Sequence, residues 1–213
     1  KTLLRVARPH DDKTIFKALD AIKKSGFQNF GADFIMGLPY QTLASFKKEL
    51  KTILAYEPPH LSCYFLSYDT KRIDLFKADS PNDDDQIKMY EHLTKTLKKN
   101  GYHHYEVSNY AKAGYESIHN QRYWEQQEYL GLGLGAHSYI NKTVWDNEQN
   151  FDAYLKNPLA THEEIQIDLE LNRMEYILLR LRTSTGIDQK TYEQKFGAAS
   201  FAKILARAQS FIE

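Results

Sequence analysis

The sequence predicts an α/β fold, because amphipathic helices alternate with apolar strands along its first half. The runs 30–36 and 61–68 have the length and the apolar and aromatic content of buried strands, and each follows a helical pattern. Two helices end alike, in Lys-Lys-Ser-Gly at 23–26 and Lys-Lys-Asn-Gly at 98–101, just before a strand. This order is typical of βαβ units with parallel strands and right-handed crossovers. Too few units are present to close a barrel, so we expect a partial (β/α) barrel completed by residues upstream.

Each helix predicted in this half has its own start and stop signals. Asp11 offers an N-cap for the first, Thr42 caps the second, and the third starts near the acidic triplet 83–85. The first and third end at glycine, and the second closes before Pro58. Apolar residues recur at helical spacing on each helix: Ile15, Phe16, Leu19 and Ile22; Leu43, Phe46, Leu50, Ile53 and Leu54; Ile87, Tyr90, Leu93 and Leu97.

Asp33 is the unusual residue of the first strand. It shares one face with Gly31 and Ile35, while bulky residues occupy the other face, and Pro39 ends the strand at about Met36. Because a strand between two helices tends to be covered on both faces, this carboxylate is expected to need partners or a raised pKa. Gly31 leaves room beside it for another group. Two interpretations stay open: a ligand contact, or a structural carboxylate that caps a neighbouring loop.

The character of the sequence changes after Gly101. Residues 102–110 predict a polar-aromatic strand, and a loop rich in hydrogen-bonding groups follows. Further on, glycines occupy every second position over 131–135. Their spacing, without a clean preceding strand, does not match a dinucleotide-binding loop. We expect these glycines to let the backbone pass close to another element or to a flat ligand.

The C-terminal region is predicted to be helical, over 169–181, 188–196 and from 198 onward. These short helices suggest a winged-helix-like unit. Its basic and acidic residues are nearly balanced, whereas a DNA-reading version would be more basic, so we expect a packing or lid role. The predicted domains are the C-terminal part of a barrel at 1–100, a polar-aromatic strand and loop segment at 101–160, and a truncated, helical, winged-helix-like domain at 161–213.

Composition limits the classes of function. The 213 residues include 42% apolar residues, and 28 basic residues balance 28 acidic ones. This balance argues against a nucleic-acid binder that relies on neutralising phosphates. The single cysteine, Cys63, excludes internal disulfides and a multi-cysteine metal site within the chain. No apolar run reaches the roughly 18 residues of a transmembrane segment, and no signal peptide is visible. We expect a cytoplasmic protein, with peripheral attachment at the inner face of the membrane as an alternative.

The most specific motifs are Asp-Phe-Ile-Met-Gly-Leu-Pro-Tyr-Gln-Thr at 33–42 and His-Asn-Gln-Arg-Tyr-Trp at 119–124. With the stretches 5–10, 105–110 and 129–139, they resemble the C-terminal half of the HemW group. These are radical S-adenosylmethionine proteins similar to oxygen-independent coproporphyrinogen III oxidase and often labelled as it. The pattern His-Asn-x-x-Tyr-Trp favours the HemW side over the true oxidase. The chain departs from the family at Ala7, Tyr40 and Leu134, where glycine, glycine and proline are common, and no departure removes a reactive group.

The resemblance implies a partial (β/α)6 barrel that holds a [4Fe–4S] cluster and S-adenosylmethionine, followed by a C-terminal domain. Arg8 and Asp33 match the family's S-adenosylmethionine contacts, and Ser67 matches a position near the adenine or ribose. A guanidinium suits the ligand's carboxylate, and a carboxylate suits its hydroxyl or ammonium donors. The chain opens without methionine and stops inside a predicted helix, so we expect a fragment cut at both ends. The three cluster cysteines would lie upstream, and Cys63 is not one of them.

The resemblance also links the motif at 119–124 to haem. Imidazole is a common axial ligand of haem iron, so His119 is the candidate ligand, and Tyr123 and Trp124 could pack on a porphyrin face. In the competing interpretation, His119 ties down a loop and Trp124 belongs to the core. His137 is a weaker candidate, because it lies in a glycine-rich run that is expected to be buried.

Three functions therefore remain open. The first is a haem chaperone that carries haem or a porphyrin and passes it to acceptor proteins. The second is a coproporphyrinogen III oxidase of the radical type, which decarboxylates propionates oxidatively. The third is an interaction module without redox chemistry, for which charge balance disfavours a nucleic-acid partner. The motif at 119–124 favours the first, and this fragment alone is not expected to be catalytically active.

Overall fold

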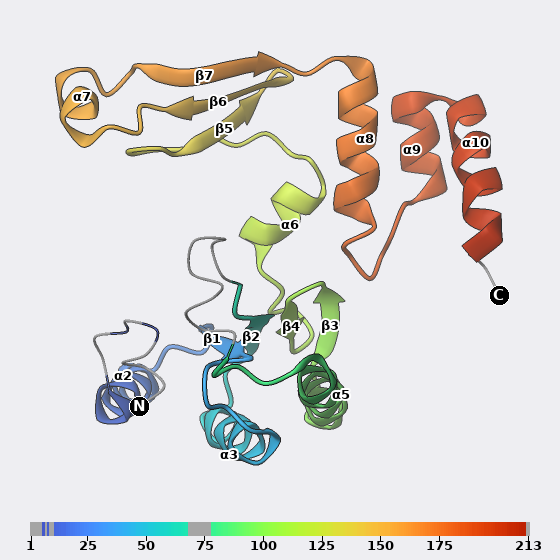
Figure 1. The fold of residues 1–213 in the computed structure, drawn as a ribbon. Coiled ribbons are helices and arrows are strands. Elements are labelled where there is room, and N and C mark those ends of the chain that lie inside the picture. The colour runs from blue at the N-terminus through green and yellow to red at the C-terminus, as the bar shows by residue number, and fades with distance from the viewer. Residues whose placement is uncertain (1–5, 7, 9–10, 68–77, 212–213) are drawn as a thin grey trace. The chain divides into compact units, whose positions relative to one another are not determined.

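The computed structural model describes residues 6, 8, 11–67 and 78–211, which form two compact units, Lys1–Ser117 and Ile118–Glu213 (Figure 1). The predicted α/β class is confirmed, since strands and helices alternate through the first unit. Within the part of the chain that the structure describes, no helix is both long enough and apolar enough to cross a membrane.

The first unit is built around a four-stranded sheet in the order β1-β2-β4-β3. Its strands are β1 (Gly31–Met36), β2 (His60–Phe65), β3 (His103–Glu106) and β4 (Asn109–Ala111). Its described helices are α2 (Asp12–Ser25), α3 (Leu43–Leu54) and α5 (Asp83–Lys99). β1 and β2 are parallel, as predicted for a βαβ unit, whereas β4 runs antiparallel to both β2 and β3.

The ends of these helices follow the local signals in the sequence. The Asp11 carboxylate accepts a hydrogen bond from the backbone N–H of Thr14 at 2.8 Å, and Thr42 forms a capping box with Ser45. Gly26 closes α2 with φ 80°, a conformation that glycine adopts without strain. For α5, the cap is Asn82, and the acidic triplet occupies the first turn, where it complements the helix dipole.

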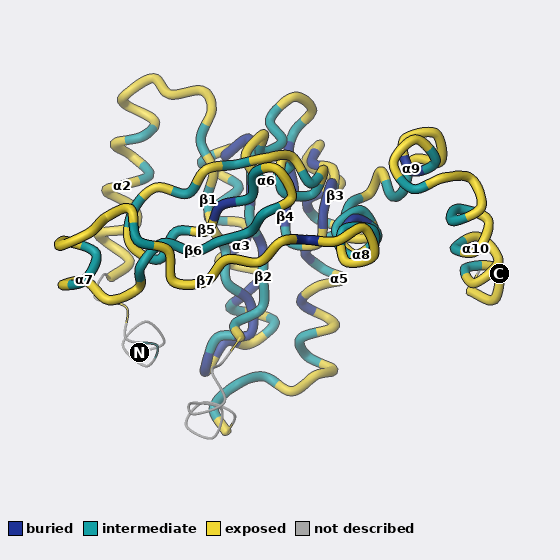
Figure 2. The backbone as a smooth tube through the Cα atoms, turned by 90° about the horizontal axis from the view of Figure 1, so that it is seen from above, coloured by how far each residue is buried: buried dark blue, intermediate teal, exposed yellow. Residues whose placement is uncertain are grey.

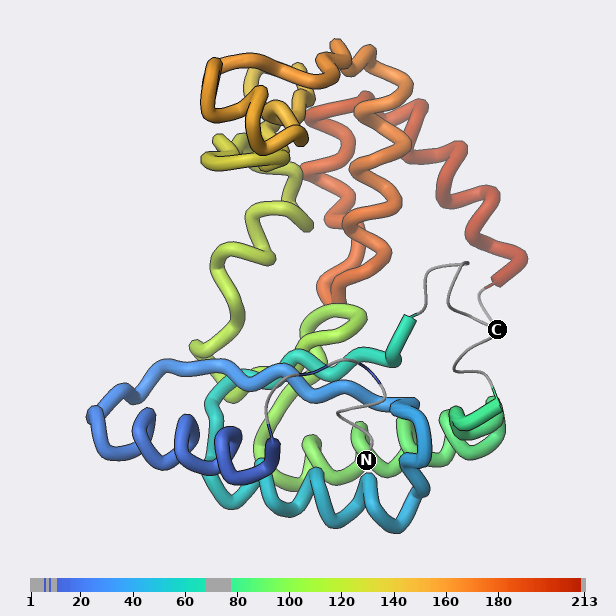
Figure 3. Tube along the Cα trace, turned by 60° about the vertical axis from the view of Figure 1, so that its left-hand side comes forward, coloured from blue at the N-terminus to red at the C-terminus, as the bar shows by residue number. Residues whose placement is uncertain are grey.

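The described helices of the first unit cover one face of the sheet. Figures 1 and 3 show α2, α3 and α5 on the same side of β1 and β2. Right-handed crossovers in one direction place the helices of successive parallel strands on one side, which explains this arrangement. The expectation that Asp33 lies on a covered face is therefore wrong: its side chain is exposed on the open face. The buried core between sheet and helices comprises Met36, Phe46, Leu50, Leu61, Cys63, Met89, Leu93, Leu97, Tyr102 and Tyr110.

The predicted single strand over 102–110 is also wrong. The segment folds into a hairpin, in which β3 and β4 pair antiparallel and Glu106 lies opposite Asn109. Residues 107–108 make the turn without glycine or proline, so the sequence lacks the two strongest turn signals. The register shifts by a β-bulge between His104 and Glu106, and Glu106 thereby lies opposite Asn109.

The second unit combines a small antiparallel sheet with helices. It begins with α6 (Ile118–Trp124), and its sheet has the order β5-β6-β7. Its strands are β5 (His137–Ile140), β6 (Thr143–Asn147) and β7 (Thr161–Gln166), and the short helix α7 (Phe151–Lys156) connects β6 to β7. The chain continues through α8 (Leu169–Arg180), α9 (Gln189–Phe196), α10 (Ala198–Ala208) and a 3₁₀ turn (Gln209–Phe211). The helices α8, α9 and α10 match the predicted segments, whereas the sequence analysis does not anticipate the sheet.

Buried residues are concentrated in the first unit (Figure 2). In the second unit, the described buried side chains include Ser138, Ile167, Tyr176 and Tyr192. An aromatic cluster joins its helices, with the rings of Tyr176 and Phe196 5.5 Å apart and those of Tyr192 and Phe201 5.7 Å apart. Much of the apolar surface of this unit is exposed, which leaves side chains available for contacts with other molecules.

The core of the first unit yields a direct test. Phe46 is fully buried, and its ring lies 5.5 Å from that of Phe34, so Phe46→Ala should leave a cavity and lower the free energy of unfolding by about 3–5 kcal/mol. Phe27, which is exposed, provides the matched control, and Phe27→Ala should change stability by no more than about 0.5 kcal/mol. Urea unfolding followed by circular dichroism measures both. Equal losses in the two variants would contradict the assignment of the core.

Candidate functional site

A row of polar side chains crosses the open face of the first sheet. Asp33 on β1 is in register with Ser62 on β2, and Ser62 is in register with Asn109 on β4. Glu106 on β3 follows, opposite Asn109. Residues in register on neighbouring strands point to the same face, so these four side chains share the face that carries no helix in the described part of this unit.

A histidine–tyrosine pair lies on the same face. His60 Nε2 and the Tyr105 hydroxyl share a hydrogen bond of 2.7 Å, and the backbone N–H of Ser117 donates to the Tyr105 oxygen at 3.2 Å. The tyrosine O–H is therefore available to donate to the imidazole. Burial lowers the pKa of His60, although the nearby carboxylate of Asp33 opposes this effect. Both observations indicate a neutral imidazole that accepts at Nε2.

Gly31 has a specific neighbour. A Cβ at this position would lie 3.4 Å from Nδ1 of His60, so the histidine ring occupies the room that the glycine leaves. The expectation that Gly31 leaves room for another group stays a prediction, because a Cβ there would make an ordinary contact with the ring. The neighbour of Gly31 is the imidazole of His60, which lies on β2 beside the strand that carries Asp33.

Glu106 and Asn109 form a buried polar pair at the end of the row. Asn109 Nδ2 donates to Glu106 Oε1, and the backbone N–H of Ser108 donates to Glu106 Oε2 at 3.3 Å. The Oδ1 atom of Asn109 is buried and has no hydrogen-bond partner among the described residues. The sequence analysis does not single out His60, Tyr105, Glu106 or Asn109 as site residues. The polar-aromatic pattern over 102–110 is the signal that could have identified three of them.

The other residues expected to contact S-adenosylmethionine are solvent-accessible. Arg8 is exposed, and Ser67 is exposed just beyond the C-terminal end of β2. Several neighbours of Arg8, among them Pro9 and His10, lie outside the described residues. Cys63 projects into the helix-covered core, where burial raises the pKa of its thiol to about 12. This protonated, inaccessible thiol does not fit the role of an iron ligand, in agreement with the sequence analysis.

In the second unit, His119 and Tyr123 lie on one turn of α6. His119 is exposed, and its ring meets that of Tyr123 edge-on at 4.9 Å. Tyr123 in turn contacts Tyr129, with ring centroids 4.5 Å apart. Trp124 is half-buried, and the guanidinium of Arg182 lies 5.2 Å from its ring centroid. Of the two aromatic residues in the motif, Tyr123 is therefore the one in ring contact with the histidine.

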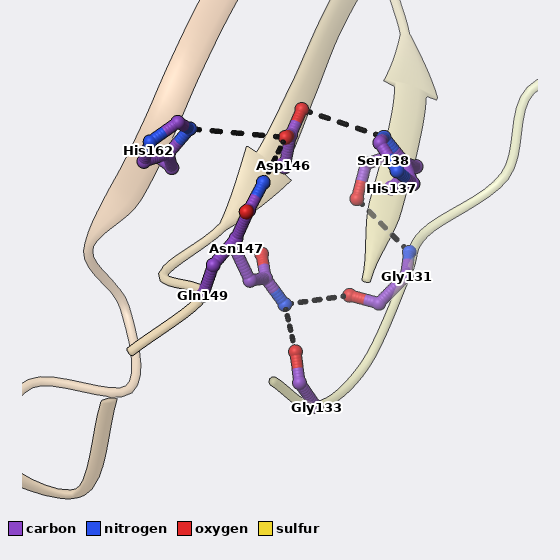
Figure 4. Close-up of polar contacts among 8 residues, drawn as sticks. All are labelled: Gly131, Gly133, His137, Ser138, Asp146, Asn147, Gln149 and His162. Carbon is purple, nitrogen blue, oxygen red and sulfur yellow. Dashed lines mark hydrogen bonds and ion pairs between the residues drawn. The ribbon is translucent and has the colours of Figure 1, made fainter. Parts of the chain in front are cut away.

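His137 lies at the start of β5 and belongs to a different cluster. The prediction that it is buried is wrong, because its side chain is 65% exposed. Its Nδ1 lies 3.4 Å from Asp146 Oδ1, and His162 Nδ1 lies 3.9 Å from the other oxygen of the same carboxylate (Figure 4). Gln149 donates to Asp146 at 2.9 Å. Asp146 on β6 thus contacts a histidine on each neighbouring strand. Its carboxylate is the partner of Nδ1 of His137.

The alternating glycines pass close to β5, as expected. A Cβ on Gly131 would lie 2.1 Å from the carbonyl oxygen of His137, so only glycine fits there. The N–H of Gly131 donates to the buried hydroxyl of Ser138 at 2.9 Å. Asn147 Nδ2 donates to the carbonyls of Gly131 and Gly133 at 3.2 and 2.8 Å (Figure 4). These contacts hold the glycine segment against the sheet.

Comparison with known proteins identifies the relatives of this chain. No family model matches it. The haem chaperone HemW of Lactococcus lactis is 32% identical over 95% of this chain and 55% of its own length. HemW of Bacillus subtilis is 30% identical over 92% of the chain and 54% of its own, and HemW of Synechocystis is 34% identical over 96% and 52%. The chain thus spans about half the length of these curated relatives.

A solved structure supports the same relationship at the level of fold. Coproporphyrinogen III oxidase (HemN) from Escherichia coli, described as a radical SAM enzyme, matches with a TM-score of 0.80 and 21% identity. The match covers 99% of this chain and 54% of that structure. The fold is shared with that enzyme, while the sequence similarity is greater to the HemW proteins. The chain is therefore similar to the HemW haem chaperones over about half of their length, and it shares the fold of the coproporphyrinogen III oxidase structure.

Proposed function

We propose that the protein containing this chain binds haem through His119 and delivers it to other proteins. The observation that carries this proposal is an exposed imidazole in edge-on contact with Tyr123, in a chain whose relatives are named haem chaperones. A neutral imidazole is a common axial ligand of haem iron, and an exposed one is accessible to a planar ligand. Tyr123 restricts the orientation of the ring and adds an aromatic surface beside the metal.

We further propose that the open face of the first sheet binds S-adenosylmethionine. Asp33 would accept hydrogen bonds from hydroxyl or ammonium groups, Arg8 would pair with the carboxylate, and Ser67 would lie near the nucleoside. The residues fit such a ligand, because Asp33 is exposed on a face without helices in the described part of this unit. In the intact protein, a [4Fe–4S] cluster would supply the electron that cleaves the sulfonium. This chain has one cysteine, so its own residues do not fit the cluster.

Coproporphyrinogen oxidation is the less favoured function. Its support is a shared fold at 21% identity, whereas three HemW proteins match at 30–34%. For the third candidate, an interaction module without redox chemistry, the balance of 28 basic and 28 acidic residues disfavours a nucleic-acid partner. Delivery of haem requires an acceptor protein, and the existence of such a partner is part of the haem proposal.

The haem proposal predicts that His119→Ala in the full-length protein shifts or abolishes the Soret band of added haem, because the axial nitrogen is lost. The matched control is His137→Ala, which removes an exposed imidazole that faces Asp146. The control should leave both the spectrum and the affinity nearly unchanged. Absorption titration with ferric haem measures both quantities.

Two outcomes would contradict this assignment. An unchanged Soret band and affinity in His119→Ala would favour the structural interpretation of the α6 motif. A loss confined to His137→Ala would move the ligand to the small sheet. Circular dichroism of both variants separates loss of the ligand from loss of folding.

The cofactor proposal predicts that Asp33→Asn weakens S-adenosylmethionine binding in the full-length protein with little loss of stability, because the carboxylate is solvated. If Asp33 were instead a structural group, the free energy of unfolding would fall by about 1–3 kcal/mol and the affinity would not change. Isothermal titration calorimetry and a urea melt distinguish the two cases. Asp84→Asn makes the same change of charge in the first turn of α5; it should leave the affinity unchanged and lower the free energy of unfolding only by the helix-dipole contribution of about 0.3–1 kcal/mol.

A further inference from the structure

Segment 129–135, which we call the leucine loop, presents three apolar side chains to solvent. Leu130, Leu132 and Leu134 are 60%, 83% and 43% exposed. They alternate along the chain with Gly131, Gly133 and Gly135, which carry no side chains. Neighbouring leucines at such exposure are typical of surfaces that contact another molecule.

The backbone of the leucine loop is fixed along its length. Tyr129 and Tyr139 exchange two backbone hydrogen bonds of 2.9 Å, and the N–H of Gly135 donates to the carbonyl of Glu148 at 3.0 Å. Between these points, Ser138 and Asn147 bind the backbone of Gly131 (Figure 4). The loop cannot rotate to bury its leucines, because the opposite side is packed too closely for any Cβ at Gly131. The apolar surface is therefore preorganised.

The loop is continuous with the proposed haem site. The rings of His119 and Tyr123 are in contact, as are those of Tyr123 and Tyr129, and Leu130 follows Tyr129 directly. Leu132 lies three residues beyond Tyr129, at most about 10 Å along an extended chain. The imidazole of His119 is thus connected to the leucine loop through the rings of Tyr123 and Tyr129.

We propose that Leu130, Leu132 and Leu134 form an apolar wall that contacts the porphyrin bound at His119. This inference rests on the proposed function. An axial imidazole holds only the iron, and the surrounding macrocycle is a flat apolar surface that must leave water to bind tightly. The leucine loop supplies such a surface without having to reorganise, and it remains exposed when the haem has been passed on.

The exposed carboxylates near the loop disfavour an anionic lipid surface, and they require the anionic propionates of haem to point away from them. Glu125 and Glu128 are exposed, and Glu128 directly precedes Tyr129. Anionic membranes attract segments rich in lysine and arginine, whereas these carboxylates would be repelled. Binding of the loop to a lipid surface is therefore the alternative, which sedimentation with vesicles can detect.

The test uses the full-length protein and ferric haem. Leu132→Ser should weaken haem binding by about tenfold, as expected when one leucine loses its buried contact, and should leave folding intact because the side chain is exposed in the free protein. Leu159→Ser is the matched control, since Leu159 is 89% exposed and lies outside the loop. His119→Ala is measured in parallel, and quenching of tryptophan fluorescence and the Soret band report binding.

Weakened haem binding in Leu132→Ser, together with wild-type haem affinity in Leu159→Ser, supports the apolar wall. Wild-type affinity in Leu132→Ser, together with lost binding in His119→Ala, overturns the wall and leaves the haem proposal standing. Unchanged affinity in both variants overturns the wall and the haem proposal together. If Leu132→Ser instead reduces sedimentation with phosphatidylserine vesicles and keeps wild-type haem affinity, the loop is a lipid contact and the proposal is wrong.

Discussion

The parallel pairing of β1 with β2 is the constraint on which the first unit depends. It sets Asp33 opposite Ser62, and its right-handed crossover places α3 on one side of the sheet. The apolar side chains of both strands then pack with α3 and α5, and the alternate positions, among them Asp33 and His60, face the other side. A one-residue slip of this register would move the polar row into the core. The hydrophobic core thus determines where the candidate cofactor contacts lie.

A second constraint organises the other unit. The backbone of Gly131 approaches the carbonyl of His137 so closely that no larger residue fits, and Ser138 and Asn147 hold it there. The same contact keeps three leucines in solvent next to the aromatic rings that lead to His119. Exposing apolar side chains lowers stability relative to burying them, which supports the proposed contact of this loop with a ligand. The close approach of Gly131 to the sheet thus accompanies the exposure of the neighbouring leucines.

Much of this architecture could be predicted from the sequence, where the signals are local. The caps at Asp11 and Thr42 and the left-handed Gly26 appear where expected, because they depend on a few adjacent residues. The exposure of Asp33 could not be predicted, since it depends on which side the crossovers take. The pairing of His60 with Tyr105 joins residues 45 positions apart, and the turn at 107–108 lacks glycine and proline. The motif at 119–124 marked His119 and Tyr123, but only tertiary contacts join them to the leucine loop.

The central claim is that the face of the first sheet that carries no helix in the described part of the chain, and not its helix-covered face, receives the cofactor. Two half-buried histidines report on the two faces: His60 lies on the open face, and His92 lies on α5 against Phe46. The imidazole resonances of both can be followed by nuclear magnetic resonance while S-adenosylmethionine is added to the full-length protein. The account predicts that the His60 resonances shift in proportion to occupancy and that those of His92 do not. A shift at His92 with no change at His60 would contradict it.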